Sequence, residues 1–199
     1  MSSRGRLFVL SAPAGTGKTT LVSRLVKELP NLVQSISYTT RAPRHGEKDG
    51  VHYYFVTPEA FGARLAAGDF LEHVTLYGDS YGTSKSQVEA LLAQGRGVIL
   101  VIDTQGALKL KGKVDAVFIF VSPPSMEELR ERLEKRKSEG SKKIEERLAV
   151  AASEIEKREA YDYEIVNDHF DTAFQKLKQI VISEEKTDGT SNSRKKSHE

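Results

Sequence analysis

Short apolar runs alternate along the chain with longer segments in which apolar side chains recur at helical spacing. Residues 7–10, 97–102 and 116–121 are almost entirely apolar, which is typical of parallel strands that are buried on both faces. An amphipathic helical pattern follows the first of these runs and ends near Pro30. The repeated order of strand and helix predicts an α/β fold with a central parallel sheet.

The region between residues 35 and 84 interrupts this rhythm with shorter β segments and polar turns. Residues 52–56 and 70–77 have the composition of strands, whereas residues 38–50 read as a loop and residues 78–82 as a turn. Small antiparallel strands do not fit the strand and helix repeat of the core. The sequence therefore predicts an inserted lobe of mixed β structure.

Two helix starts in and after this lobe are marked by capping residues. Thr57 stands before Pro58, the order expected of an N-cap followed by the first helical residue. Ser84 and Gln87 have the spacing of a capping box, and the helix that they open is predicted to end at Gly95. This second helix leads the chain from the lobe back to the core.

A highly charged helical region is predicted for residues 125–159. Ser125 and Glu128 form a second capping box at its start, and Gly140 with Ser141 divides it into two helices. Because these helices have little apolar surface, we expect a mobile lid over the site. The alternative is an ordinary pair of solvated helices.

A last short strand is predicted at residues 164–167 and a last amphipathic helix at residues 174–182, followed by a polar tail. The whole pattern predicts a three-layer α/β fold with distinct parts. These parts are the core (1–34, 85–124 and 160–183), the inserted lobe (35–84), the helical lid (125–159) and a disordered tail (184–199).

The composition is that of a globular protein, with 38% hydrophobic and 29% charged residues among 199. The 30 basic and 28 acidic residues leave a net charge of only +2, so we expect no nucleic-acid partner. The absence of cysteine excludes thiol catalysis and a cysteine-bound metal. No apolar stretch is long enough for a signal core or a membrane span, so the expectation is a cytoplasmic protein without a membrane partner.

The strand at residues 7–10 leads into a glycine-containing turn and a helix. Gly17, Lys18 and Thr19 satisfy the end of the phosphate-loop pattern GxxxxGK[ST], although Ser11 replaces its first glycine. Such a loop binds nucleotide phosphates on backbone N–H groups at a helix N-terminus, with the lysine on the outer phosphates and the hydroxyl on Mg2+. The alternative, a glycine-rich helix start, leaves the combination of these residues unexplained.

Asp103 stands directly after the apolar run at residues 97–102, where a parallel sheet faces its ligand crevice. It has two interpretations. It is a carboxylate that meets the Mg2+ shell in phosphate-loop proteins, or it caps the helix that follows.

The polar loop after residue 37 combines two arginines with hydroxyl groups. Arg41 and Arg44 are three residues apart, close to Ser37, Thr39 and Thr40. Guanidinium groups match the geometry of phosphate, so the loop is a candidate anion site. The alternative is a solvated charged loop.

Taken together, these features resemble the guanylate kinase family. The resemblance covers roughly residues 7–182, and its most specific parts read TTRAPRHGEKDGVHYYFV, DFLEHVTLYGDSYGTS, VIDTQGA and IVND. It implies an ATP:GMP phosphotransferase of purine metabolism that converts GMP, and dGMP, to the diphosphate with MgATP as donor. Mg2+ is the implied cofactor.

The resemblance also implies the site residues, which fall into two groups. Those implied for ATP are Ala12, Pro13, Ala14, Gly15, Thr16, Gly17, Lys18, Thr19, Thr20 and Asn167. Those implied for GMP are Ser37, Arg41, Arg44, Glu47, Tyr53, Glu72, Tyr81, Thr83 and Asp103. In this scheme Glu72 and the hydroxyls of Ser37 and Thr83 recognise the guanine edge, and the arginines and tyrosines hold the phosphate.

The implied catalytic residues are Lys18, Arg41, Arg136 and Arg147, which neutralise charge without a protein base. Thr19 and Asp103 are the residues implied to contact Mg2+, Asp103 through water. The chain departs from the family pattern at Val101, where an acid is common, and at Lys137, where a glycine is common.

Two alternatives to this function remain open, and so does the oligomeric state. One is a guanylate-kinase-like binding module without catalysis, which the intact Gly17, Lys18 and Thr19 and the lack of room for a companion domain in 199 residues disfavour. Another is a kinase for a different nucleoside monophosphate, with thymidylate as the main rival. The sequence also leaves open whether the chain forms a homo-oligomer.

Overall fold

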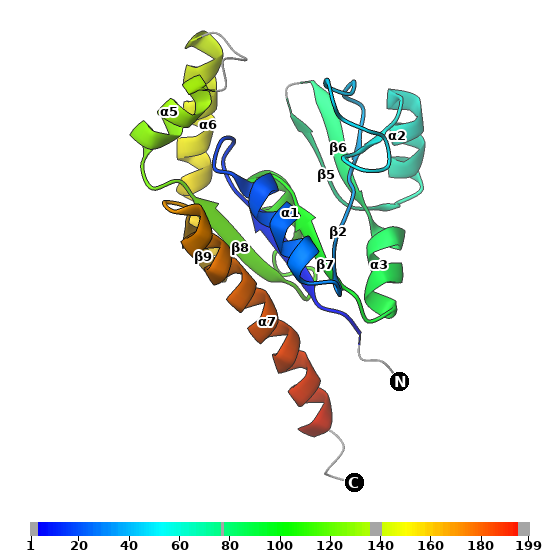
Figure 1. Cartoon of the computed structure of the whole chain (residues 1–199). Helices are drawn as coiled ribbons and strands as arrows, with labels where there is room; N and C mark the ends of the chain where they lie inside the picture. Colours follow the sequence, from blue (N-terminus) through cyan, green and yellow to red (C-terminus); the bar gives the residue numbers. More distant parts are fainter. Residues whose placement is uncertain (1–3, 77, 136–140, 195–199) are drawn as a thin grey trace.

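A five-stranded sheet forms the centre of the computed structural model, which describes residues 4–76, 78–135 and 141–194 (Figure 1). All neighbouring strands in it are parallel, and their order is β2-β7-β1-β8-β9. The strands are β1 (Leu7–Ser11), β2 (Leu32–Gln34), β7 (Gly97–Val101), β8 (Val117–Ser122) and β9 (Tyr163–Val166). The predicted parallel sheet is confirmed.

Helices cover both faces of this sheet because successive side chains of its strands point to opposite sides. Phe8 and Leu10 of β1 pack in one apolar cluster, and Leu7 and Val9 pack in another. The first cluster includes side chains from α1 (Lys18–Glu28) and α7 (Phe170–Arg194), and the second includes side chains from α3 (Lys85–Ala93) and α4 (Thr104–Leu110). The result is the predicted three-layer fold.

A second, mixed sheet has the strand order β4-β3-β6-β5. Its strands are β3 (Tyr38–Thr39), β4 (Tyr54–Phe55), β5 (Phe70–Leu76) and β6 (Asp79–Ser84). The helix α2 (Pro58–Ala66) begins at the predicted cap, where the Thr57 hydroxyl accepts a hydrogen bond from the Ala60 N–H. The inserted segment therefore has the mixed β character that was predicted.

The predicted turn at residues 78–82 is wrong for most of its length. Only Gly78, with φ of 89°, belongs to a turn, because β6 already begins at Asp79. Gly82 serves packing instead, since a Cβ atom there would lie 2.8 Å from the Phe70 ring. The antiparallel pairing of β5 with β6 imposes strand geometry on a sequence of turn-forming residues.

Two helices, α5 (Met126–Lys135) and α6 (Ser141–Ile155), form a hairpin above the sheet (Figure 1). Ser125 caps α5 as predicted by accepting a hydrogen bond from the Glu128 N–H. The hairpin has its own apolar cluster, which consists of Leu129, Leu133, Ile144, Leu148 and Ala151. The positions of Arg136, Lys137 and Gly140 lie outside the described residues. A 3-10 turn (Arg158–Ala160) connects α6 towards β9.

The last helix is longer than predicted. It begins at Phe170 rather than at residue 174, and it continues to Arg194, so the disordered tail predicted from residue 184 is wrong for residues 184–194. Glu184 explains part of the extension because it accepts a hydrogen bond from the Tyr163 hydroxyl at 2.5 Å. This contact joins segments that are distant in sequence, and a composition-based prediction has no access to it.

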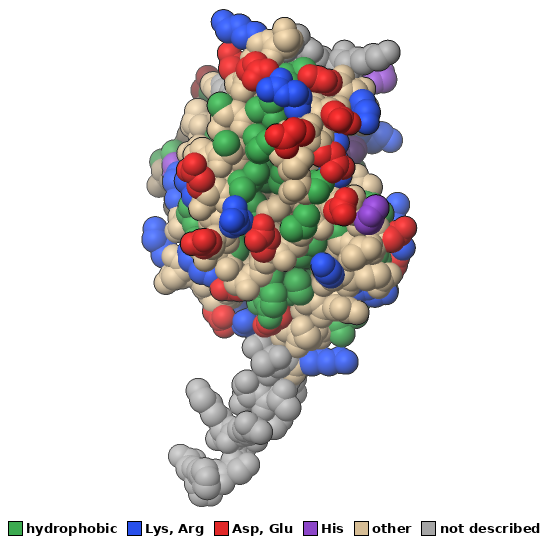
Figure 2. Space-filling view, turned by 90° about the vertical axis from the view of Figure 1, so that its left-hand side faces the viewer, with side chains coloured by type: hydrophobic (Ala, Val, Ile, Leu, Met, Phe, Trp, Pro, Cys, Tyr) green, Lys and Arg blue, Asp and Glu red, His purple; other side chains and the backbone are tan. Residues whose placement is uncertain are grey.

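The surface beside α5, α6 and β9 has an apolar band with acidic and basic side chains interspersed on both sides of it (Figure 2). No continuous basic patch covers this face. Among the described residues, no helix is both long and apolar enough to cross a membrane.

Candidate active site

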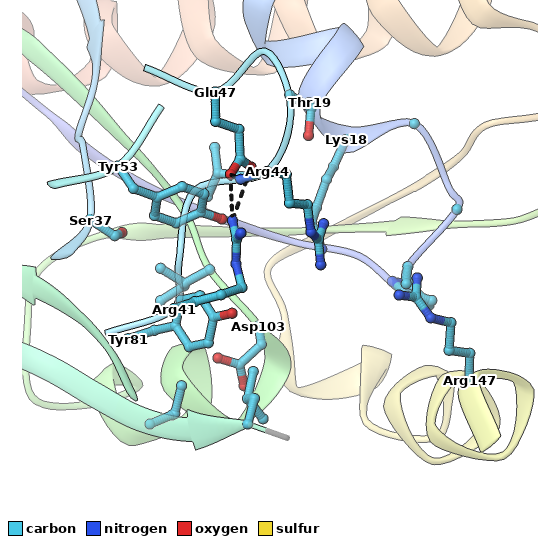
Figure 3. Close-up of a pocket in the computed structure, with 18 of the residues that line it drawn as sticks. Lys18, Thr19, Ser37, Arg41, Arg44, Glu47, Tyr53, Tyr81, Asp103 and Arg147 are labelled. Atoms are coloured by element: carbon cyan, nitrogen blue, oxygen red, sulfur yellow. Dashed lines mark hydrogen bonds and ion pairs between the residues drawn. The ribbon is translucent and has the colours of Figure 1, made fainter. Parts of the chain in front are cut away.

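A cavity of about 340 Å3 lies between the loop after β1, the inserted lobe, the end of β7 and α6 (Figure 3). Most of the predicted site residues line it. They are Pro13, Ala14, Gly15, Gly17, Lys18, Thr19, Thr20, Ser37, Arg41, Arg44, Glu47, Tyr53, Glu72, Tyr81, Asp103 and Arg147. Residues that are up to 134 positions apart in sequence therefore share one cavity, as Pro13 and Arg147 do.

The loop between β1 and α1 has the backbone geometry that an anion site requires. Gly15 and Gly17 have φ values of 93° and 90°, in the left-handed region that favours glycine. Gly17 is the N-cap of α1 and offers no side-chain cap, and no acidic residue lies in the first turn. The helix N-terminus is consequently available to a phosphate group. Lys18 extends from the same turn and donates a hydrogen bond from Nζ to the Ala12 carbonyl at 2.9 Å.

Three predicted nucleotide-binding residues do not line the cavity but brace the loop from behind. Ala12 is buried, and the Thr16 hydroxyl donates a short hydrogen bond to the Pro13 carbonyl. The buried Asn167 donates from Nδ2 to the Thr16 carbonyl at 2.6 Å. A Cβ atom at Gly17 would lie only 2.9 Å from the same Asn167 nitrogen. These contacts hold the loop in shape.

Arg41 and Arg44 form the basic part of the inserted lobe (Figure 3). Glu47 accepts hydrogen bonds from Arg41 Nη2 on both carboxylate oxygens, each at 2.9 Å, and from the Arg44 N–H at 2.7 Å. Burial opposes ionisation of Glu47, but the Arg44 amide and the Arg41 guanidinium together hold its pKa below the ordinary value. The arginine loop is thereby ordered by an acid within it.

Tyr53 and Tyr81 stand next to this loop with their rings 6.0 Å apart between centroids. The Arg41 guanidinium lies over the Tyr53 ring, 5.5 Å from its centroid. Burial raises the pKa of Tyr53, so its hydroxyl remains a hydrogen-bond donor at neutral pH. Two arginines and two phenols thus converge on one part of the cavity.

Glu72 on β5 is the buried acid of the lobe, with 6% of its surface exposed. The Thr83 hydroxyl donates to its Oε1 at 2.7 Å, and a Cβ atom at Gly106 would lie 2.6 Å from its Oε2. Burial raises the pKa of Glu72 to about 7, with Asp103 adding to the shift and Thr83 and Lys109 opposing it. Thr83 does not line the cavity, so its hydroxyl acts on Glu72.

Asp103 caps α4, so the capping interpretation is confirmed, and it also faces the cavity. Its Oδ1 accepts hydrogen bonds from the Gln105 and Gly106 N–H groups at 2.8 and 3.2 Å. Within the described residues there is no cluster of three or more acidic, histidine or cysteine side chains that would hold a metal alone. Thr19 and Asp103 nevertheless fit Mg2+, because this ion usually keeps waters and binds phosphate oxygens with one or two protein ligands.

Four apolar lining residues were not predicted as site residues. They are Val74, Leu76, Val101 and Ile102. Val74 and Leu76 follow Glu72 on alternate positions of β5, so the period of two in a strand would have placed them on the same face. Val101, noted in the sequence as a departure, adds apolar surface where an acid is common in the family.

Arg147 reaches the cavity from α6, and its guanidinium points towards the phosphate loop (Figure 3). Arg136, its predicted partner, lies outside the described residues. The site thus combines a phosphate loop, a second basic cluster with a buried acid, and an arginine from the helical hairpin.

The family model described as guanylate kinase matches residues 4–184. The chain belongs to the guanylate kinase family. A guanylate kinase of Protochlamydia amoebophila is 55% identical over 181 residues, which cover 91% of this chain and 92% of that protein. A guanylate kinase of Hahella chejuensis is 49% identical over 183 residues, which cover 92% and 88%. The resemblance inferred from the sequence is confirmed.

A crystal structure of the guanylate kinase from Anaplasma phagocytophilum has the same fold. It aligns with a TM-score of 0.76 and 38% sequence identity, covering 92% of this chain and 88% of that one. The three-layer guanylate kinase architecture is therefore supported by sequence and by structure.

Proposed function

We propose that this guanylate kinase family member transfers the γ-phosphoryl group of MgATP to GMP, and to dGMP, in purine nucleotide metabolism. The products are ADP and GDP, and we place the reaction in the cytoplasm, where both nucleotides are available. The observation that carries the proposal is a single cavity lined by two separate groups of basic residues and one buried carboxylate. A binding module without catalysis does not need the basic group that is formed by the loop before α1 and Lys18.

The donor side of the proposal rests on the loop before α1. Its backbone N–H groups and Lys18 would hold the β- and γ-phosphates of ATP. Thr19 and Asp103 would hold Mg2+, directly or through water. When bound, Mg2+ supplies positive charge that offsets the charge on the β- and γ-phosphate oxygens.

The acceptor side rests on the inserted lobe. Arg41 and Arg44, with the phenols of Tyr53 and Tyr81, would bind the phosphate of GMP. The ionised Glu72 would accept hydrogen bonds from N1–H and the 2-amino group of guanine, and Ser37 would donate to O6. Adenine lacks this pattern of donors, and a buried carboxylate without a partner is costly. We assign to Thr83 the orientation of the Glu72 carboxylate.

The chemical step follows from bringing these two phosphate sites together. An oxygen of the GMP phosphate attacks the γ-phosphorus as the bond to the β,γ-bridging oxygen breaks, and ADP leaves with the electron pair. The attacking phosphate needs no proton removed by the protein. Lys18, Arg41 and Arg147 would place and neutralise the reacting groups, and we assign Arg136 the same role.

We further propose that residues 125–159 close over the nucleotides as a lid. Its apolar cluster is separate from the two clusters on the faces of the main sheet, so the packing within the hairpin does not depend on the core. Hydrogen exchange in residues 144–152 should slow when a bisubstrate inhibitor binds. Equal exchange with and without the inhibitor would contradict the lid assignment.

The proposed reaction is tested by measuring ADP production with GMP, dGMP, AMP, UMP and dTMP in parallel. We expect turnover with GMP and dGMP to exceed that with the other acceptors. Phosphorylation of dTMP in preference to GMP would favour the thymidylate alternative. Tight binding of GMP without ADP production would favour the binding-module alternative.

A further inference from the structure

A group of buried polar side chains lies behind the active site and has no role in the reaction described above. Glu154 is half-buried near the C-terminal end of α6, and its Oε1 accepts a hydrogen bond from the Thr104 hydroxyl at 3.2 Å. Thr104 is completely buried and is the first residue of α4, directly after Asp103. This bond therefore connects the base of the hairpin to the turn that presents Asp103 to the cavity.

Two more buried hydroxyl groups lie beside this bond. Ser11 ends β1 just before the phosphate loop, and Tyr161 precedes β9. Among the described residues neither hydroxyl has a hydrogen-bond partner of good geometry. Burial raises the pKa of Tyr161, and the hydroxyls of Ser11 and Thr104 beside it oppose that shift. The polar group thus extends from α6 and α4 to the strand that carries the phosphate loop.

The ionisation of Glu154 depends on the charges of two active-site residues. Burial raises the pKa of Glu154, the positive charge of Lys18 and the Thr104 bond oppose this shift, and the negative charge of Asp103 adds to it. Lys18 and Asp103 are both cavity residues. Glu154 itself does not line the cavity, so it would act on the reaction only through its neighbours.

Helix geometry relates the position of Glu154 to that of Arg147. Arg147 and Glu154 are seven residues apart on α6, so they lie on the same face of the helix, about 20° from alignment and about 10 Å apart along the axis. Ala151, which is buried, lies between them on that face. Because both side chains project from one face, a rotation of α6 about its axis that breaks the Glu154 bond also displaces Arg147 relative to the phosphate loop.

We propose that Glu154 is a positioning residue for phosphoryl transfer, which sets the rotation of α6 and hence the place of Arg147 by its bond to Thr104. The proposal rests on the role proposed above for Arg147. It differs from that role because Glu154 touches no substrate, and it predicts a defect in turnover rather than in GMP binding. A 1 Å displacement of a charge-stabilising group can lower turnover by about 10²-fold.

Paired substitutions at both ends of the bond provide the test. Thr104→Val removes the hydroxyl at constant shape, and we expect it to lower kcat about tenfold while KM for GMP stays within about twofold. Thr104→Ser keeps the hydroxyl and should retain most of kcat. Glu154→Ala should lower kcat as much as Thr104→Val does. Glu154→Gln keeps an acceptor oxygen and should retain most of the parent kcat. The matched control is Glu156→Gln, the same change at an exposed position two residues away.

A combination with Arg147→Ala distinguishes positioning from a merely structural role. If Glu154 acts through Arg147, adding Glu154→Ala to Arg147→Ala should lower kcat no further. Independent effects would multiply instead, and that result would overturn the positioning role. Unchanged kcat in Thr104→Val would also overturn it. If Arg147→Ala alone retained full turnover, the role proposed for Arg147 would fail, which is a distinguishable outcome.

Thermal unfolding of each variant keeps the test valid if a substitution weakens the fold. Thr104→Val and Thr104→Ser differ at a buried position, so their melting temperatures should be compared before their turnover. A loss of kcat in Thr104→Val at a temperature where both variants are fully folded supports positioning. A loss of kcat that disappears when both variants are assayed well below their melting temperatures assigns Thr104 to stability and overturns the proposal.

Discussion

The phosphate loop and the inserted lobe both bring basic residues to the cavity, but they do so with different parts of the chain. The loop is one contiguous segment, shaped by Gly15 and Gly17, whose positive φ values turn the backbone at the start of α1. The lobe assembles its site from side chains of separate strands and of the loop between them. Its arginines are ordered by Glu47 and its acid, Glu72, is buried.

This difference separates general from specific recognition. Backbone N–H groups and a lysine recognise any phosphate in the right place, because they read charge alone. Recognition of a base, which we assign to the lobe, requires a desolvated polar group with few alternative partners. Burial of Glu72 has a cost that appears as its raised pKa of about 7. The five predictions below test this contrast between the two regions, beginning with the greatest loss of turnover.

Lys18→Ala should break the donor side alone. We expect kcat to fall by about 10³-fold or more, because Lys18 is placed to neutralise the transferred phosphoryl group. Calorimetry should show GMP affinity within about twofold of the parent value, since GMP binds in the lobe. A parallel loss of GMP affinity and turnover would mean that the two phosphate sites are not separate.

Glu72→Gln should break base recognition on the acceptor side. One guanine N–H would then face an amide N–H, so kcat/KM for GMP should fall by about 10²-fold, or about 3 kcal/mol. AMP makes no use of the carboxylate, and its poor turnover should stay constant or improve. Arg44→Ala is the contrasting variant, because it should reduce GMP and AMP use in proportion. A Glu72→Gln variant with the parent ratio of GMP to AMP would exclude Glu72 as the guanine reader.

The affinity for GMP should rise with pH as Glu72 ionises. Its pKa in the free protein is about 7 and guanine binds the carboxylate form, so affinity should increase about tenfold between pH 6 and pH 8 and then level off. The phosphate of GMP also titrates near pH 6. Glu72→Gln keeps that phosphate titration and serves as the control, and an identical pH profile in both proteins would contradict the assignment.

The same shift has a consequence for stability without ligand. Because the folded-state pKa of Glu72 is above its ordinary value of 4.5, the folded protein binds more protons than the unfolded chain in this range. Stability from this group is therefore complete below about pH 4.5 and is lost as pH rises through about 7, by about 3 kcal/mol. Urea unfolding of the parent and of Glu72→Gln at pH 5 and pH 8 measures how much of the pH-dependent free energy of unfolding comes from Glu72.

Glu47→Gln should loosen the acceptor site, because Glu47 holds Arg41 in place. An amide nitrogen would replace one of the two oxygens that accept from Arg41 Nη2, and the negative charge would be lost, so we expect KM for GMP to rise about fivefold with a smaller change in kcat. Glu59→Gln, the same change at an exposed position of α2, is the matched control. A rise in KM for ATP of the same size would contradict the assignment of Glu47 to the GMP side.

Local patterns were sufficient for much of the fold. The apolar runs of β1, β7 and β8 and the caps at Thr57, Ser84 and Ser125 are where the sequence predicts them. Where pairing with other strands decides, the composition of one segment is not sufficient, as for β6, which pairs with β5 and with the more distant β3. The same reason explains the underestimated length of α7, whose Glu184 binds Tyr163.

The family, the phosphate loop and most residues of the cavity could be predicted from the amino-acid sequence, because these depend on spacing within short segments. Which of those residues face the cavity and which brace it follows from the folded chain. It placed Asn167 behind the phosphate loop and Thr83 behind Glu72. It also placed Glu154 against Thr104, two residues 50 positions apart that nothing in a local pattern connects. Burial and long-range contact belong to the packed chain as a whole, and they set both the pKa of Glu72 and the orientation of α6.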